Sequence, residues 1–227
     1  MPTKHPPLPA KSSDNRDDYR AAFLSRVHQL LNLGYMSLRP SDYTLAEEED
    51  ITGEICKHMR HLTEDEPTED WMGLYSVHNE DPVNVVPDPS TSAVRRGKRR
   101  PRLDIRLVCK SRVPNMRFCI EAKRLYRTDS VSAYVDGEGL LAFLDGYYAQ
   151  SDDASGMLGY IQAKSLEHWV PKLESKIRQL VRPNNRRDVK SLMKVAFGGG
   201  PEHIYRTHHT RDGLCDIDVF HTFFLFC

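Results

Sequence analysis

The sequence predicts a single α/β domain in which helices flank a central mixed sheet. Two stretches within the first 62 residues carry apolar side chains at helical spacing, and two segments near the middle alternate between apolar and polar side chains, as half-buried strands do. The length of 227 residues, with 39% hydrophobic and 28% charged residues, suits one soluble domain. Because no apolar run approaches the roughly 20 residues that cross a bilayer, we expect no membrane contact.

The N-terminal part of the chain contains a tail and a helix. Residues 1–13 are rich in Pro, Lys and Ser, which predicts a flexible tail. This tail lacks the apolar segment of a secretory signal, so we expect a cytoplasmic protein. Helical spacing predicts a helix over 14–33 that Gly34 ends. Residues 14–40 would then be an N-terminal helical extension of a single domain spanning 14–227.

A capping box predicts the start of a second helix. Thr44, followed three residues later by Glu47, has the required spacing, and an apolar stripe then continues to residue 62. A strand is predicted over 71–77. Residues 79–100 contain three prolines and a basic run, which predict a long exposed loop.

Two alternating segments predict a β-hairpin. Residues 102–109 and 116–123 each carry apolar side chains on one face and polar side chains on the other, with a short connection between them. A symmetric turn midway between the segments places Asp104 directly across from Glu121. Lys123 lies on the same face as Glu121, because side chains two residues apart on a strand point the same way.

The rest of the chain contains further helical and strand-like patterns. Helical spacing predicts helices over 134–147 and 154–169. A further helix is expected to begin at Pro171, since proline suits the first turn of a helix better than its interior. The segments 204–210 and 217–226 have the composition of strands.

Two carboxylates that face each other across a sheet need a compensating charge. At about 5 Å and an effective dielectric constant near 20, the repulsion between Asp104 and Glu121 is roughly 3 kcal/mol. Mg²⁺ is suited to offset it, because this ion takes oxygen ligands and is held by one or two carboxylates together with substrate phosphate. The Lys123 ammonium is suited to orient an attacking water and to offset negative charge on a phosphate.

This arrangement resembles the PD-(D/E)xK, or restriction-endonuclease-like, nuclease superfamily, whose motif is an acidic residue on one core strand and E-x-K on the next. The matching residues are Asp104 and the triplet Glu121-Ala122-Lys123, while Leu103 stands where the family name has Pro. Membership implies an αβββαβ core and metal-dependent hydrolysis of phosphodiester bonds. The cofactor would be Mg²⁺, with Mn²⁺ as the alternative.

The same resemblance implies additional site residues. The two motif carboxylates would bind the metal together with the Ala122 carbonyl. The first core helix would supply an auxiliary acid, for which Glu54 is the first candidate and Glu47 the second. Gln162, which the helical pattern places in the helix after the motif, would contact nucleic acid.

The basic run before the first hairpin strand indicates a second functional region. Its cations precede Asp104 closely and are placed to contact the phosphates of DNA, with RNA as an open alternative. A solvated loop is the competing interpretation. The residues concerned are Arg95, Arg96, Lys98, Arg99, Arg100 and Arg102.

The motif also has a structural explanation without catalysis. Its three charged residues could lie on an exposed sheet face and pair with Arg102 and Arg106. An E-x-K triplet is expected about once by chance in a chain of this composition, and Glu174-Ser175-Lys176 is a second instance. The context of the first triplet, at the end of an apolar strand and opposite an Asp, favours the nuclease interpretation.

The sequence therefore predicts a metal-dependent DNA endonuclease. It contains no helix-turn-helix or zinc-finger module, so a protein partner or a second copy of the chain is expected to supply targeting. The segments GEGLLAFLDGYYAQ and GMLGYIQ look like those of nuclease-fold proteins that travel with bacterial anti-phage systems, which implies a role in host defence. The competing hypothesis is a non-catalytic subunit that keeps the nuclease fold to bind nucleic acid or a partner protein.

Overall fold

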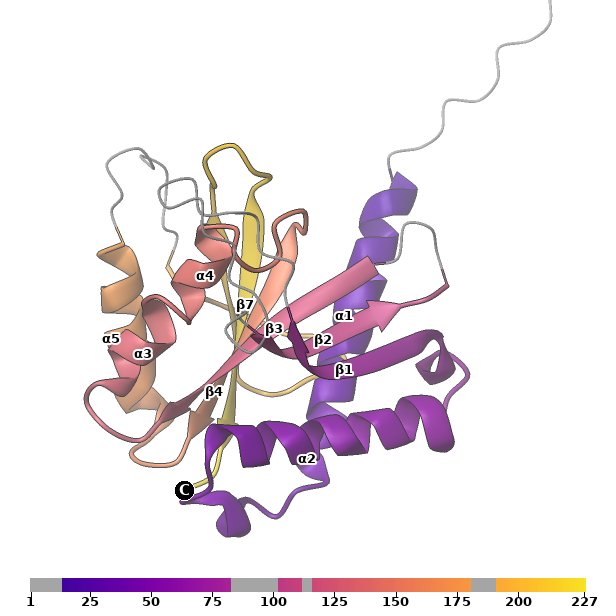
Figure 1. Cartoon of the computed structure of the whole chain (residues 1–227), viewed down its shortest axis with the longest axis horizontal. Coiled ribbons are helices and arrows are strands. Elements are labelled where there is room, and N and C mark those ends of the chain that lie inside the picture. Colours follow the sequence, from indigo (N-terminus) through magenta and orange to yellow (C-terminus); the bar gives the residue numbers. More distant parts are fainter. Residues whose placement is uncertain (1–13, 83–101, 112–115, 181–190) are drawn as a thin grey trace, which may run out of the picture.

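The structure is a computed structural model that describes residues 14–82, 102–111, 116–180 and 191–227. These residues form a seven-stranded mixed sheet with helices on both faces, as Figure 1 shows. The predicted α/β class with a central mixed sheet is confirmed. The predicted tail and the six residues from Arg95 to Arg100 lie outside the described residues. Within the described ranges, no helix is long and apolar enough to span a membrane.

The strands of the sheet are β1 (Tyr75–Pro82), β2 (Arg102–Cys109), β3 (Met116–Leu125), β4 (Ala154–Ile161), β5 (Met193–Val195), β6 (Ile204–His209) and β7 (Ile217–Leu225). Their order across the sheet is β1-β2-β3-β4-β7-β6-β5. Strand β4 is parallel to both of its neighbours, whereas the other pairs are antiparallel. The predicted hairpin and the two predicted C-terminal strands are therefore present.

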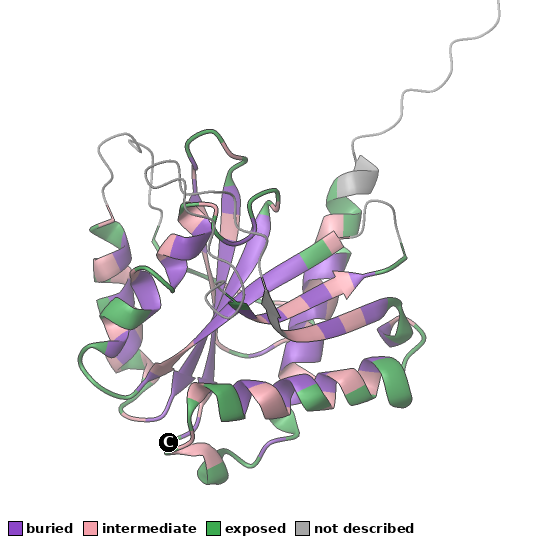
Figure 2. Ribbon diagram, in the orientation of Figure 1, coloured by how far each residue is buried: buried purple, intermediate pink, exposed green. Residues whose placement is uncertain are grey.

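The helices of the fold are α1 (Asp14–Met36), α2 (Glu48–Arg60), α3 (Ser130–Val135), α4 (Leu140–Leu144) and α5 (Leu166–Arg178). Helices α1 and α2 cover one face of the sheet and share one apolar core with it, while α3, α4 and α5 form a second core on the other face. Figure 2 shows that the strands between these layers are largely buried. Single helical turns at Pro40–Tyr43, His61–Asp65 and Met72–Leu74 connect the elements.

Helix α1 belongs to the main core. Val27 and Leu30 are fully buried, and they pack in the same cluster as Ile55 of α2. Gly34 lies inside α1 and does not end it, contrary to the prediction. A Cβ atom at Gly34 would lie 3.0 Å from a side-chain carbon of Met59, so the glycine allows α1 and α2 to approach closely.

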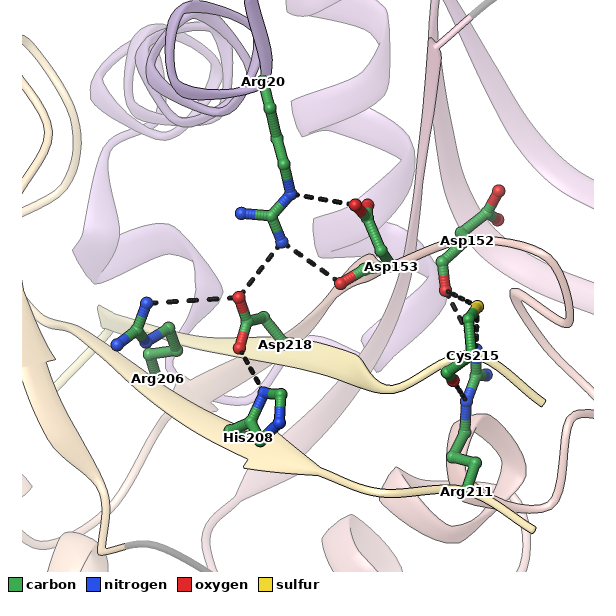
Figure 3. Close-up of polar contacts among 8 residues, drawn as sticks. All are labelled: Arg20, Asp152, Asp153, Arg206, His208, Arg211, Cys215 and Asp218. Carbon is green, nitrogen blue, oxygen red and sulfur yellow. Dashed lines mark hydrogen bonds and ion pairs between the residues drawn. The ribbon is translucent and has the colours of Figure 1, made fainter. Parts of the chain in front are cut away.

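Polar contacts tie α1 and the β6–β7 hairpin to the start of β4 (Figure 3). Arg20 of α1 donates to the side chain of Asp153 and, at 3.0 Å, to Asp218 of β7. Arg211 is only 2% exposed, and its guanidinium donates to backbone carbonyl groups. These acceptors belong to Phe143, Ala149, Gln150, Asp152 and Cys215.

The helix predicted over 154–169 is wrong. Residues 154–161 form β4, and all eight of them are buried. A strand that is buried on both faces has no alternating pattern, and its continuous apolar run can imitate helical spacing. A Cβ atom at Gly159 would lie 2.5 Å from the Phe223 ring, so this glycine is required where β4 meets β7.

The helix predicted to begin at Pro171 is also wrong. Helix α5 begins at Leu166 and continues through the proline to Arg178. Trp169, Leu173 and Ile177 are buried along one side of this helix. Their packing outweighs the one backbone hydrogen bond that Pro171 cannot donate.

Three further boundaries differ from the predictions. Strand β1 begins at Tyr75, after the turn at Met72–Leu74, and includes residues 79–82, which were predicted as loop. The helix predicted over 134–147 is divided into α3 and α4. At Gly139, between them, a Cβ atom would lie 2.1 Å from the Tyr134 carbonyl oxygen, so the chain folds back closely on α3 at this point.

The predicted capping box does not form. Helix α2 begins at Glu48, and its N-cap, Glu47, makes no side-chain capping bond. Thr44 instead follows the turn at Pro40–Tyr43. The carbonyl groups of Tyr43 and Ala46 accept hydrogen bonds from the Gln162 side chain, which holds this segment outside the helix.

Candidate functional site

The β2–β3 hairpin has the predicted register. Ile105 pairs with Ile120, and Cys109 pairs with Met116 at the other end of the ladder. The described pairing of β2 with β3 begins at Ile105. Asp104, one residue earlier on β2, therefore lies where the two strands separate. Its Oδ2 accepts a 2.7 Å hydrogen bond from the backbone NH of Ala122. The Asp104 carboxylate thus occupies the fork between β2 and β3.

Glu121 and Lys123 meet beside this fork. The Glu121 side chain is 6% exposed, and its Oε1 accepts a 2.7 Å hydrogen bond from Lys123 Nζ. Its second oxygen, Oε2, is buried and has no hydrogen-bond partner. A buried carboxylate oxygen without a partner is costly, so its presence favours a ligand that takes this position.

Glu48 completes the group, and the sequence analysis missed it. This first residue of α2 accepts from Lys123 Nζ at 3.2 Å and from the NH of Arg124 at 3.1 Å. The signal was present in the sequence, because Glu48 stands three residues before Ile51 and seven before Ile55, which are both buried. An acidic residue on the buried face of a helix is a stronger candidate for a functional site than one on the solvent-exposed face.

The two auxiliary acids named from the resemblance lie elsewhere. Glu54 follows Glu48 by six residues, about 240° around the helix, and its carboxylate pairs with Lys57 at 3.0 Å. Glu47 pairs with the guanidinium of Arg124. Of the acidic residues at the start of α2, Glu48 is therefore the one whose carboxylate contacts Lys123.

Gln162 does not lie in a helix, contrary to the prediction, but directly after β4. The residue is 7% exposed. Its Oε1 accepts from Arg124 Nε at 2.8 Å, and its Nε2 donates to two backbone carbonyls in the segment before α2. These contacts join β4, β3 and the start of α2, and they position Glu48 beside Lys123.

Of the remaining predicted residues, Ala122 and Arg102 are described. Ala122 is fully buried, and its contact in the site is the NH donated to Asp104. Arg102 is exposed at the start of β2, two residues before Asp104. The other predicted nucleic-acid contacts belong to the basic run outside the described residues.

Burial and mutual repulsion shift the pKa values of the site carboxyls. Burial raises the pKa of Asp104 to about 6, against the lowering effect of its bond from the Ala122 NH. Burial, followed by the charge of Asp104, raises the pKa of Glu121 to about 9. Burial alone would lower the pKa of Lys123, but the charges of Glu121 and Glu48 outweigh it and raise the value, so the ammonium is retained.

The donor set fits a divalent cation held by few protein ligands. Within the described residues, no three His, Cys, Asp or Glu side chains are grouped to hold a metal ion. Mg²⁺ needs only one or two carboxylates when waters and phosphate complete its shell. The partnerless Glu121 oxygen and the carboxylate of Asp104 meet that requirement, and a cation bound between them would lower both raised pKa values.

A pocket of about 350 Å³ lies at a different place, between α1 and the β6–β7 part of the sheet. Side chains of Arg20, Arg206 and Phe220 are among its lining. None of the four residues of the candidate site lines it. The candidate site is therefore separate from this pocket.

Comparison of the chain with protein-family models, with curated proteins and with solved structures finds no match in any of the three. Function is therefore inferred from the geometry of four residues, Asp104, Glu121, Lys123 and Glu48. These residues place two carboxylates, one auxiliary acid and one ammonium at the fork of two strands. Such a set is suited to bind a divalent cation and a phosphate group.

Proposed function

We propose that this protein is a Mg²⁺-dependent nuclease of the PD-(D/E)xK superfamily that hydrolyses phosphodiester bonds of DNA. The observation that carries the proposal is the convergence of Asp104, Glu121 and Lys123 at the β2–β3 fork, with one Glu121 oxygen buried and partnerless. The order α2-β1-β2-β3-α3-α4-β4, with β3 and β4 parallel, supports it, because it corresponds to the αβββαβ order of that superfamily with two short helices between the last two strands.

The residues divide the chemical work. Asp104, oriented by the Ala122 NH, and Glu121 are the metal ligands of the proposal. Bound there, Mg²⁺ would supply Lewis acidity and lower the pKa of a coordinated water. Lys123 neutralises charge on the reacting phosphate and orients the attacking water. Glu48 holds the Lys123 ammonium toward the carboxylates through its 3.2 Å contact.

A second candidate function is a non-catalytic subunit that keeps this fold for binding. The pairing of Lys123 with both Glu121 and Glu48 favours it, because the ammonium already compensates part of the negative charge. In either case, targeting by a protein partner or a second copy remains part of the proposal, as does a role in anti-phage defence.

Cleavage assays separate the two functions. Plasmid DNA and labelled oligonucleotides are incubated with the protein in Mg²⁺, Mn²⁺ or EDTA, beside Glu121→Gln and Lys123→Gln. The chain supplies a matched control in its second E-x-K triplet, where Glu174 pairs with Arg178 on α5. We expect metal-dependent cutting by the wild type and by Glu174→Gln, with losses of at least about 100-fold in the two site variants.

Metal binding is measured separately by thermal unfolding. Mg²⁺ that binds only the native state raises the free energy of unfolding by about 2.7 kcal/mol at 100 times its Kd. We expect this stabilisation in the wild type and in Glu174→Gln, and its loss in Asp104→Asn. Metal binding without cutting would favour the non-catalytic subunit, whereas neither metal binding nor cutting would contradict the nuclease.

A further inference from the structure

The end of β3 and the turn that follows it carry two arginines and an exposed tyrosine next to the candidate site. The guanidinium carbon of Arg124 lies 4.4 Å from the centroid of the Tyr126 ring, and that of Arg127 lies 5.0 Å from it. Both distances are within the range of a cation–π contact. Tyr126 is 37% exposed and the Arg127 side chain is 63% exposed. We call these three residues the Tyr126 cluster.

The Tyr126 cluster is held in place before any ligand arrives. The Oγ of Ser130 accepts hydrogen bonds from the backbone NH groups of Tyr126 and Arg127, at 3.3 and 3.2 Å. The Arg124 guanidinium donates to Gln162 at 2.8 Å. Because turn and guanidinium are already ordered, a ligand that stacks on them loses less free energy to ordering the protein.

A single carboxylate connects this cluster with the candidate site. Glu48 accepts from the Lys123 ammonium through one oxygen and from the Arg124 NH through the other. Three residues of extended chain span at most about 10 Å, which limits the backbone distance from Lys123 to Tyr126. A nucleotide with its phosphate at Lys123 therefore has a base within reach of the Tyr126 cluster.

The chemistry of the cluster suits an unpaired base. Aromatic rings and guanidinium planes are the groups on which proteins stack the bases of single strands, whereas paired bases are contacted at their edges in a groove. Burial of the site favours the same substrate. The side chains of Glu121 and Lys123 are 6% and 14% exposed, so a phosphate that contacts them must approach closely between neighbouring groups, which a flexible strand does more easily than a rigid duplex.

We propose that the Tyr126 cluster is a stacking platform for an unpaired nucleobase beside the phosphate that is cut. The inference rests on the proposed nuclease function and names its substrate as a single strand, including a single-stranded flap or loop. Tyr126 supplies the aromatic ring. Arg127 supplies an exposed guanidinium, which pairs with the equally exposed Asp129 at 2.6 Å and in the proposal exchanges that partner for a base and a neighbouring phosphate.

The test measures binding apart from cutting. Fluorescence anisotropy is recorded with a labelled single-stranded oligonucleotide and with the matching duplex, in Ca²⁺ without Mg²⁺. The variants are Tyr126→Leu and Tyr126→Trp, and Tyr19→Leu is the matched control, because Tyr19 on α1 is 40% exposed. Loss of one stacked base predicts about 5- to 150-fold weaker single-strand binding by Tyr126→Leu. Tyr126→Trp and the control keep wild-type affinity, and thermal unfolding checks that each variant is folded.

Failure of the platform and failure of the nuclease give different results. Equal losses of affinity for single strand and duplex, an unchanged affinity in Tyr126→Leu, or no single-strand binding by the wild type would each overturn the platform. Tyr126-dependent binding without Mg²⁺-dependent cutting would keep the platform and remove the nuclease. If Tyr126→Leu cut single strands as fast as the wild type, the nuclease would stand and the platform would be overturned.

Discussion

The ammonium nitrogen of Lys123 lies 2.7 Å from Oε1 of Glu121, and the two residues are only two positions apart on β3. Their side chains share one face of the sheet because direction alternates along a strand. The same ammonium contacts Glu48 at 3.2 Å, and Asp104 lies close enough to shift its pKa. One cation therefore faces three carboxyl groups, an arrangement with more negative than positive formal charge.

Removal of the Lys123 ammonium is expected to destabilise the fold. Lys123→Met leaves Glu121 and Glu48 without their shared hydrogen-bond donor, which should lower the free energy of unfolding by roughly 1–3 kcal/mol in EDTA at pH 8. Urea denaturation measures the change. Lys176→Met is the control, since that side chain is 32% exposed and its contact with Asp136 is 3.4 Å long. A loss below about 1 kcal/mol in Lys123→Met would show that the pair contributes no more than a surface ion pair.

Glu121→Gln is expected to stabilise the protein at high pH in EDTA. The folded-state pKa of Glu121 is raised to about 9 from an ordinary 4.5, so the folded chain holds a proton that the unfolded chain has released. The contribution of Glu121 to stability therefore falls as pH rises from 4.5 to 9, by up to about 1.4 kcal/mol per pH unit. Glutamine lacks this titration. Denaturation curves from pH 5 to pH 8.5 should show a gain for Glu121→Gln that grows with pH, and a constant difference would contradict the argument.

Arg211 is expected to be a major determinant of stability. Arg211→Met leaves the carbonyl groups of Ala149 and Asp152, among others, without their buried donor, and should cost about 3–5 kcal/mol. Arg178→Met is the control, because Arg178 is 57% exposed and pairs with Glu174 on its own helix. In Arg211→Met, hydrogen exchange should show the largest loss of protection in residues 149–152, because the carbonyl groups of this segment lose the Arg211 guanidinium as their donor. Uniform loss across the sheet would argue against this local role.

His28 is expected to make the fold sensitive to acid. Burial lowers its pKa to about 4, despite the raising effect of its bond to the Leu24 carbonyl. Between pH 6.5 and 4 the unfolded chain binds a proton at His28 that the folded chain does not, so the contribution of His28 to stability falls as pH falls, by up to about 1.4 kcal/mol per pH unit. The His28 ring lies 4.3 Å from the Phe197 ring, so a phenylalanine fits this place. His28→Phe should therefore reduce the dependence of stability on pH, as measured by urea titrations. The His61 side chain is half exposed, so the control His61→Gln should leave the dependence of stability on pH unchanged.

The hairpin was predictable because its signal is local. One face of β2 packs on the core, with Ile105 and Leu107 buried, and this leaves a clear alternation in the sequence. A short connection then sets the register that brings Asp104 to the fork opposite Glu121. The same logic identified α1 and the two C-terminal strands, each of which shows its own period.

Helix α2 shows where local signals were insufficient. The Thr44 and Glu47 spacing predicted a start three residues too early. It took no account of Gln162, whose side chain binds the carbonyls of residues 43 and 46 from more than 100 residues away. The resemblance offered Glu54 and Glu47 on this helix, whereas the structure places Glu48 against Lys123. The contacts that hold the start of α2 there are long-range ones.

By itself, the sequence determined the α/β class, the β2–β3 register and the shared face of Glu121 and Lys123, because periodicity records which side of an element is buried. Tertiary structure alone decided that 154–161 is the central strand β4, since a segment buried on both faces carries no period. It also decided that Glu48 joins Lys123 and that the Gln162 side chain contacts Arg124. Those outcomes depend on which elements pack together, and a local pattern does not encode them.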